Sequence, residues 1–244
     1  NNSYTDSARV SPIFPTNYKV TITGNNGCSS IEEVNVAVKS LPSPTIAGYQ
    51  KVCIGDSVTL TANGGNSYQW INGGTNSSET FMVNSAQNFS VIATGANGCS
   101  KTVNYFVSID TLPHVDAGTN QNLCAGDKAT LTANGALTYS WSNNINGQTI
   151  LVSPSSTSEY FVYGTDINGC TGIDSMTVTL NMLPTVSAGN DTAICIGDTA
   201  KLNASGGTYY FWNNGSSIAD NHVNPTSTST YIVTVANNNG CYNY

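Results

Sequence analysis

The sequence predicts an all-β protein, a tandem array of β-sandwich repeats with a fixed period. The first observation is a set of seven cysteines that form two series, each with a spacing of 71. The second is a succession of short alternating apolar segments separated by turn-forming residues, with no helical apolar stripe. The third is the composition, with 32 Asn, 30 Thr and 28 Ser among 244 residues and only 9% charged residues.

The period is visible in several residue types at once. One cysteine series is Cys28, Cys99, Cys170 and Cys241, and the other is Cys53, Cys124 and Cys195. The three tryptophans of the chain, Trp70, Trp141 and Trp212, keep the same spacing, and each follows a tyrosine by two positions. Agreement among unrelated residue types indicates a true structural repeat.

The Leu-Pro pairs at 41–42, 112–113 and 183–184 mark the expected boundaries, because proline lacks a backbone donor and stiffens a linker. The predicted domains are a partial repeat over 1–42 with only its C-terminal strands, complete repeats over 43–113 and 114–184, and a repeat over 185–244 that lacks most of its last strand. We expect the sequence to be a window on a longer array, and no signal-peptide pattern opens it.

Residues 114–184 show the expected order of strands within one repeat. Strands are predicted at about 114–123, at 129–133, at 139–141, at 148–152, around Tyr160 and Val162, and at 176–180, with an Asn-Gly turn at 166–169. About seven short strands separated by turns are typical of an immunoglobulin-like sandwich.

Each repeat is expected to have one large aromatic anchor in its core. Packing of the immunoglobulin type would place Trp70, Trp141 and Trp212 at the centre, against Leu60, Leu131 and Leu202. The aromatic residues Tyr18, Phe89, Tyr160 and Tyr231 would begin the strand that precedes the Asn-Gly turn. In a repeat of this length these anchors matter, because so small a domain is only marginally stable alone.

Composition and spacing exclude several classes of function. A net charge of −7 with a single arginine, Arg9, argues against nucleic acid, and no apolar run is long enough for membrane insertion. The cysteines form no CxxC pair, and His114 and His222 occupy non-equivalent positions, so we expect no metal site, no cofactor and no catalytic site. The oxygen-rich turns at Asp166 and Asp191 are explained by turn chemistry better than by calcium.

Cysteines at repeating positions of a charge-poor β protein indicate disulfides and therefore an extracellular compartment. Two pairings remain open. Bonds within a repeat would be Cys53–Cys99, Cys124–Cys170 and Cys195–Cys241, but a strand of about 25 Å would separate these cysteines. We therefore favour the bonds between neighbouring repeats, Cys53–Cys170 and Cys124–Cys241. A short or displaced first strand would reverse this preference.

The repeat motif resembles a known family. In residues 114–184 the motif reads Cys124-Ala-Gly-Asp127, Leu131-Thr-Ala133, Tyr139-Ser-Trp141, Pro154-Ser-Ser-Thr-Ser-Glu-Tyr160 and Asn168-Gly-Cys170. It is similar to the Ig-like or PKD-like repeats of large secreted Bacteroidota cell-surface proteins, among them gliding-associated adhesins and substrates of type IX secretion. The resemblance covers the whole chain and implies a place on the cell surface.

The same resemblance implies O-glycosylation, which in that group occurs at Asp-Ser or Asp-Thr followed by a small or apolar residue. Six sites in the chain fit this pattern: Ser7, Ser57, Thr111, Ser175, Thr192 and Thr199. Serine and threonine are abundant throughout, so chance matches are also expected. We expect glycans at one or more of the six.

The expected function is structural: a rod, stalk or filament segment of a secreted adhesion or gliding appendage, stabilised by disulfides. Its partners would be neighbouring repeats, other copies in a filament and surface glycans. The alternative is a carbohydrate-binding or spacer module of a secreted polysaccharide-acting protein, with Tyr163, Tyr209 and Tyr210 as candidate stacking residues. For Tyr210 the simpler interpretation is the Tyr-x-Trp position of the core.

Overall fold

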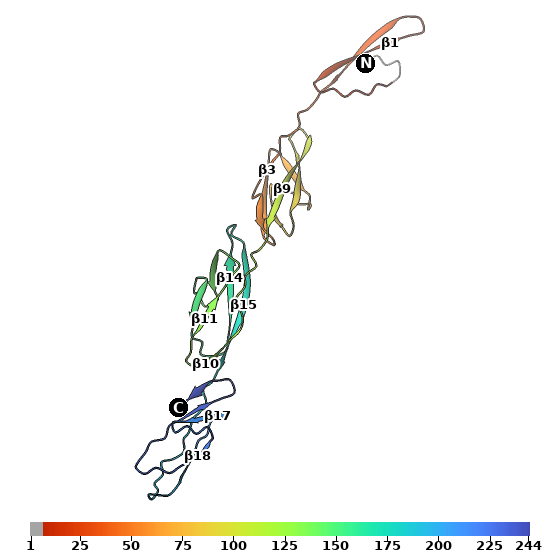
Figure 1. Cartoon of the computed structure of the whole chain (residues 1–244). Helices are drawn as coiled ribbons and strands as arrows, with labels where there is room; N and C mark the ends of the chain where they lie inside the picture. Colours follow the sequence, from red (N-terminus) through yellow and green to blue (C-terminus); the bar gives the residue numbers. More distant parts are fainter. Residues whose placement is uncertain (1–6) are drawn as a thin grey trace. The chain divides into compact units, whose positions relative to one another are not determined.

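The computed structural model describes residues 7–244, and within this range it contains strands and turns but no helix (Figure 1). The chain divides into two compact units, residues 1–111 and residues 112–244. The all-β, immunoglobulin-like class predicted from the alternating segments is observed, and the period of the cysteine series fits the positions of the strands.

The first unit begins with an antiparallel hairpin of β1 (Thr16–Thr23) and β2 (Ser29–Val36). The turn between these strands closes through a hydrogen bond from the Gly24 amide to the Cys28 carbonyl. Apolar side chains of the hairpin remain exposed, including Val20 and Val34. It therefore has no core of its own within the described residues.

Seven strands follow in the first unit and form a two-sheet sandwich. They are β3 (Thr45–Ala47), β4 (Lys51–Cys53), β5 (Ser57–Asn63), β6 (Ser67–Trp70), β7 (Ser78–Met82), β8 (Gln87–Thr94) and β9 (Ser100–Asp110). One sheet has the order β3-β5-β7 and the other β4-β9-β8-β6. Strand β4 runs parallel to β9, whereas the other pairs are antiparallel.

The core of this sandwich follows from alternation along its strands. Val58 and Leu60 of β5 point inward between exposed polar neighbours, as the period of two requires. Trp70 packs against Phe81 with ring centroids 5.5 Å apart, and Phe81 lies 4.5 Å from Phe89. The two sheets thus enclose one aromatic cluster, together with aliphatic side chains such as Val58 and Leu60.

The second unit contains two further strand sets, of which the first closely follows the predicted order. It comprises β10 (Gln121–Cys124), β11 (Ala129–Thr132), β12 (Thr138–Trp141), β13 (Thr149–Val152), β14 (Ser158–Thr165) and β15 (Thr171–Asn181). Its sheets are β11-β13 and β10-β15-β14-β12.

The strand expected at 114–123 is broken into two pieces. Asp116 forms a single antiparallel bridge with Asn134, and β10 then begins at Gln121 in the other sheet. Gly118, with a φ of 82°, lies between the two pieces and allows the chain to cross between sheets. As a result, β10 pairs parallel with β15 and reaches the end of that strand.

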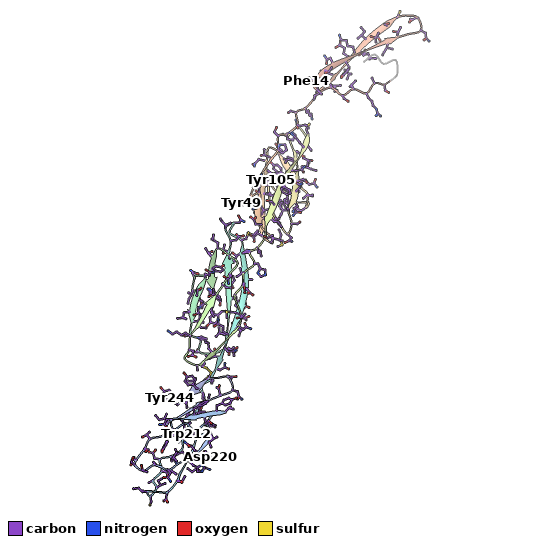
Figure 2. The ribbon with its side chains drawn as sticks, in the orientation of Figure 1. Phe14, Tyr49, Tyr105, Trp212, Asp220 and Tyr244 are labelled. Carbon is purple, nitrogen blue, oxygen red and sulfur yellow. A yellow bond between two sulfur atoms is a disulfide. The ribbon has the colours of Figure 1, made fainter. Side chains whose placement is uncertain are left out.

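The last strand set is β16 (Ala200–Asn203), β17 (Tyr209–Trp212), β18 (Asp220–Val223), β19 (Val233–Ala236) and β20 (Tyr242–Asn243). Its sheets are β16-β18 and β17-β19-β20. The buried cluster here consists of Ala204, Trp212, Val233 and Val235, and is smaller than the clusters of the other two sandwiches. Trp212 is labelled in Figure 2.

A close backbone approach recurs at three glycines that follow one another by one repeat period, Gly64, Gly135 and Gly206. All three have positive φ, and a Cβ at Gly135 would lie 1.9 Å from the His114 carbonyl oxygen. A Cβ at Gly206 would meet the Thr185 carbonyl oxygen at 1.8 Å. Only glycine therefore lets the segment after each Leu-Pro pair lie against the rest of its sandwich.

Candidate functional site at the junction between repeats

Cys124 lies at the end of its sandwich because of how β10 pairs. In the parallel ladder with β15, Cys124 is opposite Asn181, the last residue of that strand. The following Cys-x-Gly-Asp motif is a β-turn in which the Asp127 amide donates to the Cys124 carbonyl at 3.0 Å. Gly126 has a φ of 99° at the third position, where such a turn favours glycine. The motif thus ends strand β10 and leaves the Cys124 side chain at the end of the sandwich.

Cys241 is positioned by a tight hairpin turn. The Asn237 amide donates to the Cys241 carbonyl at 2.9 Å, and the Gly240 amide donates to the Asn237 carbonyl at 3.1 Å. The Oδ1 atom of Asn237 accepts hydrogen bonds from the amides of Asn239 and Cys241, each at 3.0 Å. This side chain therefore caps the turn from within, as asparagine commonly does.

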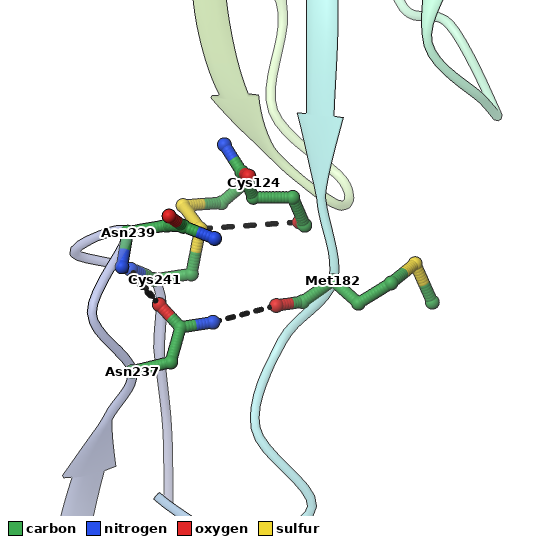
Figure 3. Close-up of a disulfide and its surroundings, with 6 residues drawn as sticks. Cys124, Met182, Asn237, Asn239 and Cys241 are labelled. Atoms are coloured by element: carbon green, nitrogen blue, oxygen red, sulfur yellow. Dashed lines mark hydrogen bonds between the residues drawn. A yellow bond between two sulfur atoms is a disulfide. The ribbon is translucent and has the colours of Figure 1, made fainter. Parts of the chain in front are cut away.

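Cys124 and Cys241 form a disulfide with a Cα–Cα distance of 5.5 Å and a sequence separation of 117 residues (Figure 3). Cys241 is fully buried and Cys124 half-buried. The bond joins one of the two cysteine pairs that the strand-length argument favours. The alternative bonds Cys124–Cys170 and Cys195–Cys241 are not formed, because each would use a cysteine that is already paired.

Two hydrogen bonds accompany the disulfide. The amide group of the Asn237 side chain donates to the Met182 carbonyl at 2.9 Å, and that of Asn243 donates to the Pro184 carbonyl at 3.2 Å. The Cys241 sulfur also lies 3.9 Å from the Asn181 carbonyl oxygen. Since a disulfide sulfur has no proton to donate, this is a contact only. The turn is therefore tied to the segment 181–184 as well as to Cys124 (Figure 3).

A related contact occurs in the first unit. The side-chain amide of Asn97 donates to the Ser40 carbonyl at 2.9 Å, and Lys39 donates to the Asn97 carbonyl at 3.0 Å. Ser40 and Met182 are two periods apart, so the same linker carbonyl accepts in both places. The donors are not equivalent, because Asn97 belongs to an Asn-Gly-Cys motif whereas Asn237 precedes such a motif by two residues. Sequence reasoning missed both asparagines, and the recurring motif could have directed attention to Asn97 only.

The remaining cysteines fall into two groups. Cys28, Cys99 and Cys195 are free thiols, whereas Cys53 and Cys170 are not. The Cys-x-Gly-Asp turn recurs at Cys53 and at Cys195, where the Asp56 and Asp198 amides each donate to the cysteine carbonyl at 3.0 Å. The local frame that presents Cys124 is therefore present in all three copies of the motif.

Most of the expected core anchors are fully buried. Trp70 and Trp141 are 2% exposed and Trp212 is 4% exposed. Each indole Nε1 donates to a backbone carbonyl six residues further on, at 2.9 to 3.0 Å. Leu60 and Leu131 are also buried, but Leu202 is only half-buried. The sheet β16-β18 encloses fewer buried partners, so the third leucine lacks the cover that the other two have.

The candidate stacking tyrosines separate into two kinds. Tyr210 is half-buried, and its hydroxyl donates to the Gly207 carbonyl at 2.9 Å, which matches the bonds of Tyr68 and Tyr139 in their own turns. Its role in the Tyr-x-Trp frame is therefore structural. Tyr163 and Tyr209 are 43% and 54% exposed.

The oxygen-rich turn at Asp166 uses its carboxylate within the chain. Its Oδ1 accepts from the amides of Asn168 and Cys170 at 2.8 and 2.9 Å. The described residues contain no group of three His, Cys, Asp or Glu side chains that could hold a metal ion, so no such group includes Asp191, His114 or His222. The turn therefore resembles that of Asn237 and offers few free carboxylate oxygens to an ion.

The carboxylate of Asp174 has a structural role. Hydrogen bonds from the backbone amides of Ala117, at 2.8 Å, and of Ser175 lower the pKa of Asp174 below its ordinary value of 3.8. The neighbouring Ser175 hydroxyl donates to Glu159 at 2.9 Å and is half-buried. Of the other candidate glycosylation residues, Ser7, Ser57, Thr111, Thr192 and Thr199 are exposed, while Asp6 of the first motif lies outside the described residues.

Comparison with known proteins gives a fold-level likeness. No protein-family model and no curated protein matches the sequence. Among solved structures, the N-terminal eight Ig domains of Down Syndrome Cell Adhesion Molecule share 15% identity at a TM-score of 0.33, over 86% of this chain and 34% of that one. The Ca²⁺-stabilized adhesin with which an Antarctic bacterium binds ice shares 13% identity at a TM-score of 0.34, over 94% and 79%.

A 1.5-MDa bacterial ice-binding adhesin, studied for host cell surface retention, shares 14% identity at a TM-score of 0.30, over 84% of this chain and 96% of that one. The chain thus spans about a third of the first of these structures. Likenesses of this size do not indicate what the chain binds. In the described part of the chain, no helix has the length and apolar character needed to cross a membrane.

Proposed function

We propose that this chain is a structural stalk segment of a secreted cell-surface protein, in which disulfides staple neighbouring repeats together. The Cys124–Cys241 bond carries the proposal, because it links the end of one sandwich to a turn of the next strand set. The repeats would have the boundaries 1–42, 43–113, 114–184 and 185–244. A stalk needs joints that resist bending and extension, and a covalent joint supplies that resistance.

The same staple is proposed one period earlier, between Cys53 and Cys170. Each of these cysteines precedes a member of the observed bond by one repeat period, and neither is a free thiol. Their turns have the same hydrogen bonds as those of the observed pair. The Asp56 amide donates to the Cys53 carbonyl, and the Asp166 amide donates to the Cys170 carbonyl. The free thiols Cys28, Cys99 and Cys195 have no partner at this separation within the sequence, which agrees with a staple of fixed span.

An extracellular setting is part of the proposal, because disulfides persist in oxidising compartments. The surface of Asn, Ser and Thr, together with the repeat motif, favours an adhesion or gliding-type appendage exported by type IX secretion. No catalytic role is proposed. Glycans are proposed at one or more of Ser7, Ser57, Thr111, Ser175, Thr192 and Thr199, and the intact mass of the natively secreted protein tests this. A mass equal to that of the bare polypeptide would rule them out.

Single-molecule pulling tests the staple in the full chain. The background variant carries Cys28→Ser, Cys53→Ser, Cys99→Ser, Cys170→Ser and Cys195→Ser, so that only the Cys124–Cys241 bond can form. The bond removes a loop of 117 residues from the path of the force. The oxidised chain should therefore extend about 400 Å less than the same chain carrying Cys124→Ser and Cys241→Ser.

The outcome decides the proposal. A shortened extension that dithiothreitol abolishes would support a covalent joint in the path of the load. Equal extension with and without the two cysteines would show that force bypasses the joint, and the stalk proposal would then fail. Restoring Cys53 and Cys170 to the oxidised background tests the earlier staple, and because the two loops overlap between Cys124 and Cys170 the extension should fall by only a further ~85 Å.

A further inference from the structure

The outward face of the sheet β17-β19-β20 carries a group of exposed aromatic side chains. In this sheet Tyr209 is paired with Ala236, which is paired in turn with Tyr242. In the next row, Phe211 is paired with Thr234. Cross-strand partners share a face, so these five residues lie together on the side opposite the core.

These aromatic residues interrupt the repeat. One period earlier, the positions of Tyr209, Phe211 and Tyr242 hold Thr138, Ser140 and Thr171, and two periods earlier they hold Ser67, Gln69 and Ser100. The intervening core positions keep their identity, since Tyr210 and Trp212 match Tyr139 and Trp141. The fold therefore accepts small polar residues at these three positions, and stability does not require aromatic residues there.

The aromatic side chains are also well exposed. Tyr209, Phe211 and Tyr242 are 54%, 56% and 65% exposed. Large apolar side chains gathered on one face of a soluble domain commonly mark a binding surface. Isolated exposed residues would carry no such meaning, but these three share one small sheet.

On this face a strand with small outward side chains lies between two strands with large ones. Adjacent strands are about 4.8 Å apart, so β17 and β20 lie roughly 9.6 Å apart across β19. The small side chains of Ala236 and Thr234 lie on β19, between Tyr209 and Phe211 on β17 and Tyr242 on β20. We call these five residues the aromatic trough. A flat ligand lying along β19 would contact aromatic rings on both sides and the Thr234 hydroxyl below.

The chemistry of this face selects the kind of ligand. None of its side chains is charged, and the nearest ion pair of the same strand set, Lys201–Asp220, lies on the other sheet, β16-β18. A charged polymer would find no counter-charge there. Tyrosine offers a large rigid face and a hydroxyl at low entropic cost, which suits a ligand with apolar ring faces and many hydroxyl groups.

We propose that this aromatic trough is a binding site for a neutral glycan chain. The site would add recognition to a stalk and does not depend on the stalk role. The disulfide supports the site, because Tyr242 directly follows Cys241 and is held in β20 by the staple. The junction would thereby fix one side of the aromatic trough.

The experiment uses the full chain, oxidised, and measures binding by affinity electrophoresis in gels containing soluble β-1,3-glucan, xylan or mannan. Alginate, an acidic polysaccharide, serves as the charged probe. The test variant combines Tyr209→Thr and Phe211→Ser, the residues that the preceding repeat carries at these positions, so that the fold is retained. The matched control is Tyr49→Thr, which removes an exposed tyrosine from the first unit.

Binding of at least one neutral glycan should weaken about tenfold or more in the double variant and stay unchanged in the control. Circular dichroism of both variants checks the fold. No retardation by any of the three neutral glycans, or equal retardation of wild type and double variant, would overturn the proposal. So would preference for alginate. A concentration-dependent dimer in light scattering that the double variant abolishes would instead assign the face to self-association.

Discussion

Loss of the Cys124–Cys241 bond should destabilise the strands after residue 185 far more than those before it. With the preceding sandwich folded, Cys124 lies beside Asn181, so the loop closed by the bond runs only from about Asn181 to Cys241. Closing some 60 residues contributes about 4 kcal/mol by chain entropy. The fully buried part of this core is small, so a loss of that size approaches its whole stability.

Hydrogen exchange with mass spectrometry measures this effect strand by strand. In the variant Cys124→Ser/Cys241→Ser, amide protection in β17 and β19 should fall by roughly 10³, since each 1.4 kcal/mol is tenfold. Protection in β12 and β14 should change little. Cys195→Ser, which removes a free thiol from the same strand set, is the matched control. Protection in β17 and β19 that stayed within threefold of wild type would refute the loop-closure reasoning.

Three further results are expected. Asn237→Asp keeps the turn-capping acceptor but loses the donor to Met182, so thermal unfolding should show a loss of about 1 to 2 kcal/mol; no loss would deny the linker bond a stabilising role. The pKa of Asp174 is lowered in the folded chain, so its contribution is present above pH 5 and lost as the pH falls below about 4; urea titrations at pH 3 to 7 should show this slope, and Asp174→Asn should remove it. Gly135→Ala should cost about 2 kcal/mol more than Gly126→Ala, because both have positive φ but only the first Cβ meets a carbonyl, and equal losses in chemical denaturation would count against the close approach.

The sequence allowed the strand order and the class of fold to be predicted because both depend on local periodicity. Alternation at Ala129 and Leu131 and the Tyr139–Trp141 pair place strands that the structure has at those positions. The break in the strand expected at 114–123 was not predicted, because it depends on a crossing between sheets at Gly118. Local pattern does not report which sheet a strand joins.

The junction shows a similar limit. Cysteine spacing identified the residues of the staple, since a covalent bond recurs with the repeat. The donor role of Asn237 was not predicted, because it depends on where a turn of one strand set meets the linker carbonyl of Met182. The aromatic trough was missed for a related reason: Tyr209 and Tyr242 are far apart in sequence and meet only through the register of β19.

Chain entropy alone does not explain why the bond spans two repeats. A bond within a repeat would close 46 residues, and closing 117 residues instead gains only roughly 0.8 kcal/mol. With the neighbouring sandwich folded, the effective loop shortens to about 60 residues and the advantage falls further. A bond within each repeat would therefore stabilise the cores almost equally well. What only the longer bond adds is a fixed joint, and the hydrogen bonds from Asn237 and Asn243 to the linker reinforce that same joint. The placement of the disulfide thus favours a mechanical role for the junction over a purely stabilising one.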